Sequence, residues 1–538
     1  MDIISLIAGL SAPAAYPDAV RHVEIRQTHI SVICLTEDVV YKIRKPVKFP
    51  FLDFSSLPQR RFDCEREVEL NQRLAPDVYL GIVPIVLRDG KIHVEGPGEI
   101  IDWAVKMRRL PDEASLEHRL DRGEIGPEMI GMLGRRLAQF HAAAASGAHI
   151  AQYGRHAVVS RNVLENLDVI PKSGGTLLEP EQLTRLAELI RLRLDKDRDL
   201  IERRAARGIP RDTHGDLRLD HVYFFPECVP PADLSVIDCI EFNDAFRYAD
   251  PVADIAFLIM DLKFHGDSDL ARRLADDYFT ESHDEEGRQL LPLYVSYRAA
   301  VRAKVATLEL AESEIPESER LAAAERARGL WRLALSELEI PSRRPCLVLV
   351  GGLQGTGKTS LARGLAEVAG FTVIRTDVVR KELARTSASP STGAAGQGGL
   401  YASEWTERTY EECLWRAVDL LRQGQRVIVD GTFLLERHRR RFLEAARSLA
   451  LSGLFLSCQA DPQVIRRRLA ERTGDASDAD WEVYRAAVEK WEPASDLTAR
   501  VTAITDCSGS TLSARLFAAD VLRKAELLEP LDSDTSGA

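Results

Sequence analysis

The chain has 538 residues, of which 45% are hydrophobic and 29% are charged, and its formal net charge is −12. This length exceeds what one hydrophobic core can serve, and the composition is typical of globular domains that each bury a core. The acidic balance argues against a broad nucleic-acid-binding surface, because phosphate backbones are bound by clustered Lys and Arg. Nucleic acid is therefore disfavoured as a partner, and a local basic groove stays open as the alternative.

The cysteines and the first residues indicate the cellular compartment of the protein. Eight cysteines are scattered along the chain without the paired spacing of a metal site, which indicates reduced thiols in a cytoplasmic protein. Asp2 precedes the first apolar stretch, and no Lys or Arg does, so this segment is a poor signal peptide. No run of about 18 apolar residues is present, so no membrane span is expected.

The first half of the chain places strands before helices. Residues 30–50 alternate between apolar and polar and predict antiparallel strands, and residues 61–74 predict a surface helix. The other predicted elements are strands at 78–87, 100–110, 222–225 and 236–240, and helices at 128–144, 179–207 and from 252 to about 335. This order is typical of an α+β fold with two lobes.

A composition break separates this region from the rest. The two prolines of IPSRRP end a helical stretch, and we place a linker at 336–345, between a domain at 1–335 and another at 346–525. From Cys346 onward strands and helices alternate, which predicts an α/β domain with a parallel sheet. Residues 387–399 are of low complexity, and residues 526–538 are predicted to be a disordered tail.

A phosphate-binding pattern stands at the start of the second domain. G-x-x-x-x-G-K-T lies between an apolar strand and an amphipathic helix. Its glycines let backbone N–H groups close around phosphate oxygens, while the lysine reaches the β- and γ-phosphates and the threonine binds Mg²⁺. The pattern predicts ATP and Mg²⁺ as cofactors, bound by Gly352, Leu353, Gln354, Gly355, Thr356, Gly357, Lys358, Thr359 and Ser360.

Charged residues follow the next predicted strands. Asp377 could accept a proton from an acceptor hydroxyl, or it could only cap a helix, and Arg380 could hold an anionic group or the transferring phosphate. Asp430 could hold Mg²⁺ through water or orient Arg380, with a strand-end cap as the alternative. Arg468 and Arg472 share a helix face and predict either a lid over the phosphates or a solvated basic face.

These residues resemble the small P-loop kinase family that includes polynucleotide kinase, gluconate kinase and antibiotic-phosphorylating relatives. The resemblance covers about residues 345–525 and rests on GLQGTGKTS, RTDVVRKEL, VIVDGTF and RRRLAERTGDASDADWEVY. It implies that Asp377 is the base that activates an acceptor hydroxyl, and that Arg380 contacts the substrate or the phosphate. It also implies that the segment 387–399 lies near the acceptor.

A second set of candidates lies in the first domain. Asp216 follows His-Gly between a helical region and a short strand, and Asp238 ends the next apolar strand, which suits a base and a metal ligand. Upstream, Lys42 lies on a predicted strand and Glu67 on a predicted helix, a pair that holds the α- and β-phosphates in kinase-like folds. Alone, the lysine would be a surface residue and the glutamate a solvated one. Their order along the chain indicates a catalytic set.

This region resembles aminoglycoside phosphotransferases and related small-molecule kinases over about residues 25–310. The matching segments are YKIRKP, WAVKMRRLP, LAQFH, HGDLRLDH and IDCIEFNDAFRYADPVADIAFL. The resemblance implies a protein-kinase-like fold in which Lys42 and Glu67 position ATP, Asp216 is the base and Asp238 binds Mg²⁺. It also implies that Asp254 has a structural role beside the metal site.

The catalytic loop departs from that family at two positions. The family has His after Asp-Leu and Asn three residues later, whereas this chain has Arg218 and His221. The Asn ordinarily binds a second Mg²⁺, and His221 is a weak metal candidate because hard cations prefer oxygen ligands. No Gly-rich loop is evident near residues 27–38. A one-metal kinase, altered chemistry and a domain that only binds nucleotide all stay open.

We therefore expect a fusion of two ATP-dependent phosphotransferase modules that act on a hydroxyl of a small molecule. The alternatives are a C-terminal polynucleotide 5′-hydroxyl kinase, and an N-terminal pseudokinase that regulates the P-loop module. The sequence indicates neither the acceptors, nor coupling between the sites, nor the oligomeric state.

Overall fold

The computed structural model describes residues 2–49, 52–172, 177–310, 316–386, 403–471 and 481–530. Its contacts divide the chain into two compact units. The N-terminal unit comprises Met1–Asn162, Leu194–Asp261 and Asp269–Tyr294, and the P-loop unit comprises Val163–Arg193, Leu262–Ser268 and Val295–Ala538. Helices before the predicted linker at 336–345 thus cluster with the P-loop unit, and the linker itself stays a prediction. Arg472 and the segment 387–399 lie outside the described residues.

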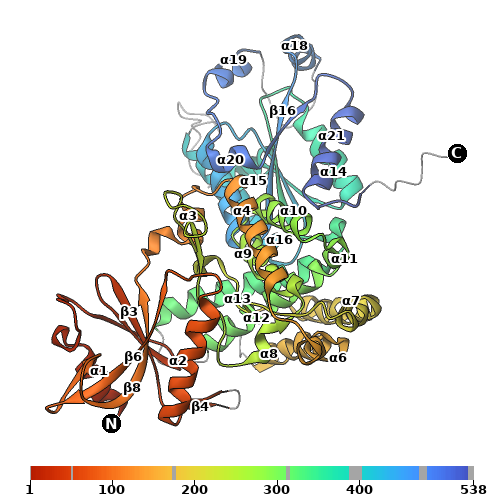
Figure 1. Cartoon of the computed structure of the whole chain (residues 1–538). Helices are drawn as coiled ribbons and strands as arrows, with labels where there is room; N and C mark the ends of the chain where they lie inside the picture. Colours follow the sequence, from red (N-terminus) through yellow and green to blue (C-terminus); the bar gives the residue numbers. More distant parts are fainter. Residues whose placement is uncertain are drawn as a thin grey trace. The chain divides into compact units, whose positions relative to one another are not determined.

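The N-terminal unit contains a six-stranded antiparallel sheet in the order β1-β2-β3-β8-β6-β7. Helix α2 (Leu57–Asn71), which a capping box at Ser56 and Gln59 begins, lies along the sheet in Figure 1. The strands are β1 (Glu24–Gln27), β2 (Ser31–Leu35), β3 (Val39–Arg44), β6 (Tyr79–Arg88), β7 (Lys91–Val94) and β8 (Glu99–Arg108). The strands expected at 30–50, 78–87 and 100–110 and the helix expected at 61–74 are confirmed.

An unpredicted helix, α1 (Ile3–Leu10), precedes this sheet. It buries Leu6 and Leu10 against the sheet core, which includes Val32 and Ile43. The apolar residues at the start of the chain therefore complete a hydrophobic core.

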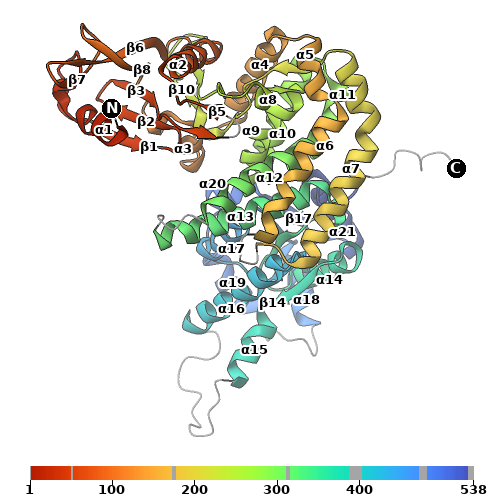
Figure 2. The ribbon, with the colours of Figure 1, turned by 90° about the horizontal axis from the view of Figure 1, so that it is seen from below.

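Helices dominate the rest of the first half, as expected from strands first and helices later. Figure 2 shows α4, α9 and α10 packed together. The helices are α3 (Leu116–Asp121), α4 (Pro127–Ala143), α5 (Ala148–Ala151), α6 (His156–Leu164), α7 (Pro180–Ala206), α8 (Asp244–Arg247), α9 (Pro251–Phe264), α10 (Ser268–Ser282), α11 (Glu285–Arg288), α12 (Leu291–Glu309) and α13 (Glu317–Leu338).

Short strands carry the loops between these helices. β10 (Val222–Phe224) pairs with β11 (Leu234–Val236), and β9 (Arg211–Asp212) pairs with β12 (Tyr248–Ala249). The strand expected at 236–240 is wrong beyond Val236, because the backbone leaves the extended conformation and Asp238 adopts a positive φ of 63°.

The P-loop unit contains a five-stranded sheet in which every pairing is parallel, as predicted, in the order β14-β15-β13-β16-β17. The strands are β13 (Cys346–Gly351), β14 (Thr372–Arg375), β15 (Val427–Asp430), β16 (Ser452–Gln459) and β17 (Thr502–Asp506). The helices are α14 (Lys358–Ala369), α15 (Thr376–Thr386), α16 (Ser403–Arg422), α17 (Glu436–Ser448), α18 (Pro462–Ala470), α19 (Trp481–Glu489), α20 (Asp496–Arg500) and α21 (Thr511–Lys524).

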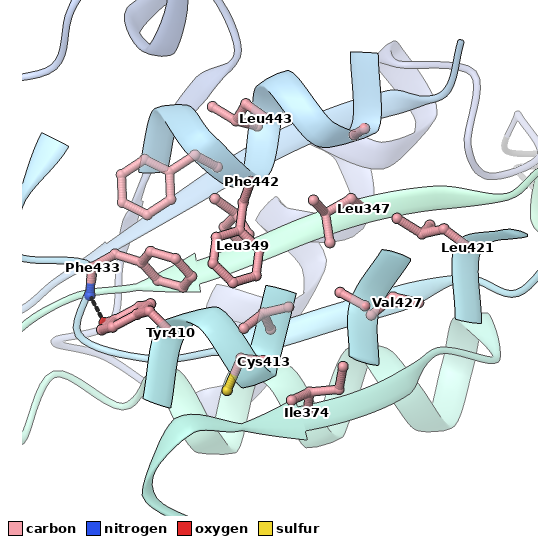
Figure 3. Packing of buried hydrophobic residues seen from close by; sticks show 14 of the residues in the cluster. Leu347, Leu349, Ile374, Tyr410, Cys413, Leu421, Val427, Phe433, Phe442 and Leu443 are labelled. Carbon is pink, nitrogen blue, oxygen red and sulfur yellow. Dashed lines mark hydrogen bonds between the residues drawn. The ribbon is translucent and has the colours of Figure 1, made fainter. Parts of the chain in front are cut away.

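Both faces of this sheet are buried. Leu347 and Leu349 of β13 face one core, where Tyr410 of α16 and Phe442 of α17 cover them, as Figure 3 shows. Alternate residues of the same strand face a second core beneath α14 and α21. A parallel sheet covered on both faces explains why its strands are continuous apolar runs.

The chain stays packed beyond the predicted start of the tail at residue 526. Leu527 is buried, and its carbonyl accepts a hydrogen bond of 2.7 Å from Arg426.

Within the described ranges, no helix is both long and apolar enough to cross a membrane.

Candidate active sites

The P-loop connects β13 to α14 and depends on its glycines. Gly352 has a φ of +147°, and a Cβ there would lie 2.5 Å from the carbonyl oxygen of Cys458. Gly357 is left-handed at the N-cap of α14. The Nζ of Lys358 donates to the carbonyl of Leu353 at 3.3 Å, so the ammonium lies over the loop that would cradle phosphates.

A threonine and an aspartate meet beside this loop. The Thr359 hydroxyl donates to Oδ2 of Asp430 at 2.7 Å, and the other carboxylate oxygen of this buried aspartate has no hydrogen-bond partner among the described residues. Burial raises the pKa of Asp430, against the opposing charge of Lys358. A hydroxyl and a carboxylate oxygen are ligands that Mg²⁺ accepts alongside phosphate oxygens and water, so this pair fits the predicted metal site.

Arg375 also reaches this aspartate. Strand register places it opposite Asp430, and its Nε lies 3.5 Å from Oδ2. Arg375 was not among the predicted site residues, and Arg380 was the arginine that Asp430 was expected to orient. The position of Arg375 at the end of a predicted strand, shortly before Asp377, was the sequence signal that could have identified it as a site residue.

Asp377 lies in the first turn of α15, directly after β14, and Arg380 follows three residues later on the same helix. A guanidinium nitrogen of Arg380 is 3.5 Å from Oδ1 of Asp377. Because β14 and β15 pair in parallel, Asp377 just after β14 and Asp430 at the end of β15 lie at the same edge of the sheet. A carboxylate in a first helical turn also stabilises that turn, so the capping role and the base role are compatible.

Arg468 of α18 makes two contacts at the P-loop. It donates to the carbonyl of Cys507 at 2.8 Å and to that of Gly355 at 3.4 Å, and so joins the loop to the chain that follows β17. The structure thus places Arg468 at the predicted nucleotide site, bound to backbone carbonyls. Its predicted partner Arg472 lies in a range that the structure does not describe.

In the N-terminal unit, Lys42 joins two carboxylates. Its Nζ donates to Glu67 at 2.9 Å and to Asp238 at 3.0 Å. Glu67 is fully buried, whereas the Asp238 side chain is 47% exposed. The charge of Lys42 holds the pKa of Asp238 well below its ordinary value. The predicted strand lysine, helix glutamate and loop aspartate therefore meet at one point.

A buried arginine reinforces this group. Arg44 lies two residues beyond Lys42 on β3 and donates to Asp63 at 2.6 Å, to Glu67 at 2.5 Å and to Glu241. Sequence reasoning missed Arg44, Asp63 and Glu241. The alternation of a strand puts residues two apart on the same face, so the arginine was open to prediction, although its partners were not.

The loop that carries Asp216 brings it close to both departures from the family pattern. Arg218 has a guanidinium nitrogen 3.7 Å from Oδ2 of Asp216. His221 bonds through Nδ1 to the carbonyl of Asp216 at 2.9 Å, and its Nε2 lies 3.6 Å from Oδ2 of Asp238. Because a carbonyl only accepts, Nδ1 carries a proton and Nε2 faces the candidate metal ligand.

Asp254 holds this loop in place through hydrogen bonds to its backbone. Its carboxylate accepts the backbone N–H groups of His214 at 2.9 Å and Gly215 at 2.8 Å, and lies 3.1 Å from Nε2 of His141. Burial opposes its ionisation, yet the bond to His141 and these backbone donors hold the pKa of Asp254 at about 2. Burial lowers the pKa of His214 to about 4. The geometry fits the structural role predicted for Asp254.

Among the described residues, no group of three His, Cys, Asp or Glu side chains could hold a metal ion. Mg²⁺ in phosphoryl-transfer sites is bound by one or two carboxylates together with substrate phosphates. The Thr359–Asp430 pair and Asp238 match that smaller donor set.

Known proteins resemble the chain in whole and in part. A family described as "AAA domain" matches residues 347–494. A sugar kinase from Janibacter sp. HTCC2649 aligns with a TM-score of 0.27 and 16% identity, covering 35% of this chain and 99% of that one. A choline/ethanolamine kinase family protein from Mesorhizobium loti aligns with a TM-score of 0.34 and 13% identity, covering 62% and 95%.

A relative spans nearly the whole chain. The "Uncharacterized protein Rv2004c" of Mycobacterium tuberculosis (strain ATCC 25618 / H37Rv) is 33% identical over 465 residues, which are 86% of this chain and 89% of that protein. A match of this length must include the loop that carries Asp216 and Asp238 as well as the P-loop. The chain therefore belongs to the family of this mycobacterial protein.

Proposed function

We propose that the P-loop unit is an ATP- and Mg²⁺-dependent phosphotransferase that moves the γ-phosphate to a hydroxyl of a small molecule. The observation that carries this proposal is the gathering of the P-loop after β13, Asp430 at the end of β15 and Asp377 after β14 at one sheet edge. Ligands of parallel α/β sheets bind outside the carboxyl ends of the strands, where the strand order reverses. The AAA match over the same residues supports nucleotide binding.

In this proposal each residue has a stated task. Lys358 neutralises charge on the β- and γ-phosphates, while Asp377 orients the acceptor hydroxyl and takes its proton. Thr359 and Asp430 would hold Mg²⁺, which when bound would neutralise charge on the phosphate oxygens. Phosphoryl transfer depends mainly on such positioning and charge, so no covalent intermediate with the protein is invoked.

A second candidate activity belongs to the N-terminal unit. The contacts of Lys42 with Glu67 and Asp238 support a second ATP site, in which Asp216 would be the base. The resemblance to aminoglycoside phosphotransferases favours a small-molecule acceptor. Arg218 beside the base and His221 near Asp238 keep the pseudokinase alternative in place.

An ADP-release screen of the full chain tests these proposals. The panel contains hydroxylated metabolites, antibiotics and oligonucleotides with a 5′-hydroxyl, and it compares the wild type with Lys358→Ala, Asp216→Ala and the exposed-site control Lys91→Ala. Loss with Lys358→Ala alone identifies one enzyme and one pseudokinase. If neither active-site substitution alters any ATP-dependent turnover, both proposals fail. Turnover of oligonucleotides that falls steeply with salt would favour the polynucleotide kinase alternative.

A further inference from the structure

A pocket of about 360 Å³ lies beside the first residues of the P-loop, entirely within the P-loop unit. The loop, the end of β16 and the helices α18 and α19 enclose it. Its lining residues are Gly352, Leu353, Thr356, Ser457, Cys458, Gln459, Ala460, Ile465, Tyr484, Val488 and Trp491.

The lining is uncharged. Among the described residues around the pocket there is no Asp, Glu, Lys, Arg or His. Tyr484 and Trp491 contribute aromatic surface, and Tyr484 stacks on Trp481 with ring centroids 5.0 Å apart. Ser457 and Gln459 supply polar groups. A charged ligand would lose hydration here without gaining an oppositely charged side chain from the lining, so the pocket favours a neutral ligand with an apolar, planar part.

The position of the pocket indicates which reactant it serves. A P-loop lysine reaches the β- and γ-phosphates of the nucleotide. Here the Nζ of Lys358 bonds to the carbonyl of Leu353, and Leu353 lines the pocket. The pocket therefore adjoins the γ-phosphate end of the loop, where an acceptor must approach.

We propose that this pocket receives the acceptor, and that the acceptor is an uncharged molecule combining an aromatic or aliphatic body with a hydroxyl. Sugar acids, polycationic aminoglycosides and oligonucleotides are disfavoured because each would bring charge into an uncharged site. The inference rests on the proposed function for the transfer step, whereas the preference for a neutral ligand follows from the pocket itself.

A pair of ligands that differ in charge tests the preference without needing the natural acceptor. Binding of 2-naphthylmethanol and of 2-naphthoate to the full chain is measured with Mg²⁺ and a non-hydrolysable ATP analogue present. We expect the alcohol to bind at least about tenfold more tightly. Val488→Arg introduces a charge into the lining and should weaken alcohol binding about tenfold or more. Ala486→Arg, at an exposed position of the same helix outside the lining, should leave binding unchanged.

Equal or tighter binding of the naphthoate, or alcohol binding that survives Val488→Arg, would overturn the inference. Weaker alcohol binding with the ATP analogue than without it would also overturn it, because the pocket would then bind the adenine ring of the nucleotide. Lys358-dependent turnover that Val488→Arg leaves intact would also overturn it. The expected binding pattern without ATP-dependent turnover on any acceptor would preserve the neutral-ligand pocket and reject the proposed kinase.

Discussion

The contact between Thr359 and Asp430 orients the two predicted Mg²⁺ ligands beside the P-loop. One carboxylate oxygen accepts the hydroxyl at 2.7 Å, and the other is buried without a described hydrogen-bond partner. A buried polar atom left unsatisfied costs about 1–3 kcal/mol, which a bound metal or its water would recover. The arrangement therefore favours occupation of the site.

We expect Thr359→Val, which keeps the branched shape and removes the hydroxyl, to lower apparent Mg²⁺ affinity by about 10- to 100-fold. The physical reason is the loss of one metal ligand and of the bond that orients Asp430. Mg²⁺ titration of ADP release measures the effect. Thr359→Ser restores the hydroxyl and should recover most of the affinity, whereas equal Mg²⁺ dependence in all three proteins would contradict this role.

His214 predicts a pH dependence of stability in the N-terminal unit. Its pKa is lowered to about 4 by burial, so between pH 4 and its ordinary value of 6.5 the unfolded chain binds more protons than the folded one. Stability therefore falls as pH drops through that window. From about pH 7.5 to about pH 5 the loss should be about 2 kcal/mol.

Denaturant unfolding at these two pH values measures that loss. His214→Gln should reduce the difference between the two values by about the same amount, and the exposed-site control His22→Gln should not. An identical pH dependence in wild type and His214→Gln would show that His214 is not the titrating group.

At the scale of elements, the P-loop backbone depends on a close approach between two segments. A Cβ on residue 352 would meet the carbonyl oxygen of Cys458 at 2.5 Å, and backbone at that distance cannot rotate aside as a side chain can. Gly352→Ala should therefore shift the loop and weaken nucleotide binding about 100-fold.

Gly370→Ala, at the other end of α14, provides the matched control. This glycine is also left-handed, with a φ of +66°, but nothing lies within 4 Å of its Cβ position. We expect a stability cost of about 1 kcal/mol without a change in nucleotide affinity. Calorimetric titration with a Mg²⁺–ATP analogue separates the two effects, and equal affinity losses would indicate strain alone.

Burial does not by itself separate the strands that were expected from those that were missed, because β14, with one buried residue, was expected and β16, with four in a row, was not. β13 and β15 are buried at every position, so their continuous apolar runs mark them clearly. β17 has a mixed burial pattern in which Ile504 is exposed and one residue of five is buried, and it was not identified from the sequence. A continuous apolar run marks a strand most clearly when both of its faces are buried, whereas β16 and β17 were located only by the structure.

Sequence reasoning named the four kinase-like residues but not the side chains that surround them. Lys42, Glu67, Asp216 and Asp238 were named in sequence order, and the fold brings them together. The bond between Arg44 and Glu241 joins residues 197 positions apart. Strand alternation gives the face of a residue, but the partner on that face is decided by tertiary packing, which one sequence does not contain.

At the scale of the whole molecule, segments distant in sequence build the P-loop unit. Arg185 donates to both carboxylate oxygens of Glu339 at 2.8 and 2.9 Å, and Lys263 does the same with Glu337 at 2.7 and 2.8 Å. These pairs attach residues from the first half of the chain to α13 and to the chain that follows it. A composition break therefore gives a linear boundary, whereas contacts give interleaved units.

Substitution of Lys42 and of Lys358 allows the number of nucleotide sites in the intact protein to be counted. If both sites bind ATP, the wild type should bind two molecules of a Mg²⁺–ATP analogue per chain at saturation. Lys42→Met and Lys358→Ala should each retain one, and the double variant none, because each lysine supplies phosphate-binding charge at one site only. Equilibrium dialysis measures the stoichiometry, with Lys91→Ala as the exposed-lysine control.

The same experiment separates an enzyme from a regulator. A stoichiometry of two, combined with turnover that Asp216→Ala leaves unchanged, would identify the N-terminal unit as a nucleotide-binding pseudokinase. A stoichiometry of one that Lys42→Met does not lower would show that the contact of Lys42 with Glu67 and Asp238 serves stability alone. In that case Lys42→Met should instead lower the unfolding free energy, because it leaves buried Glu67 without one of its two cations.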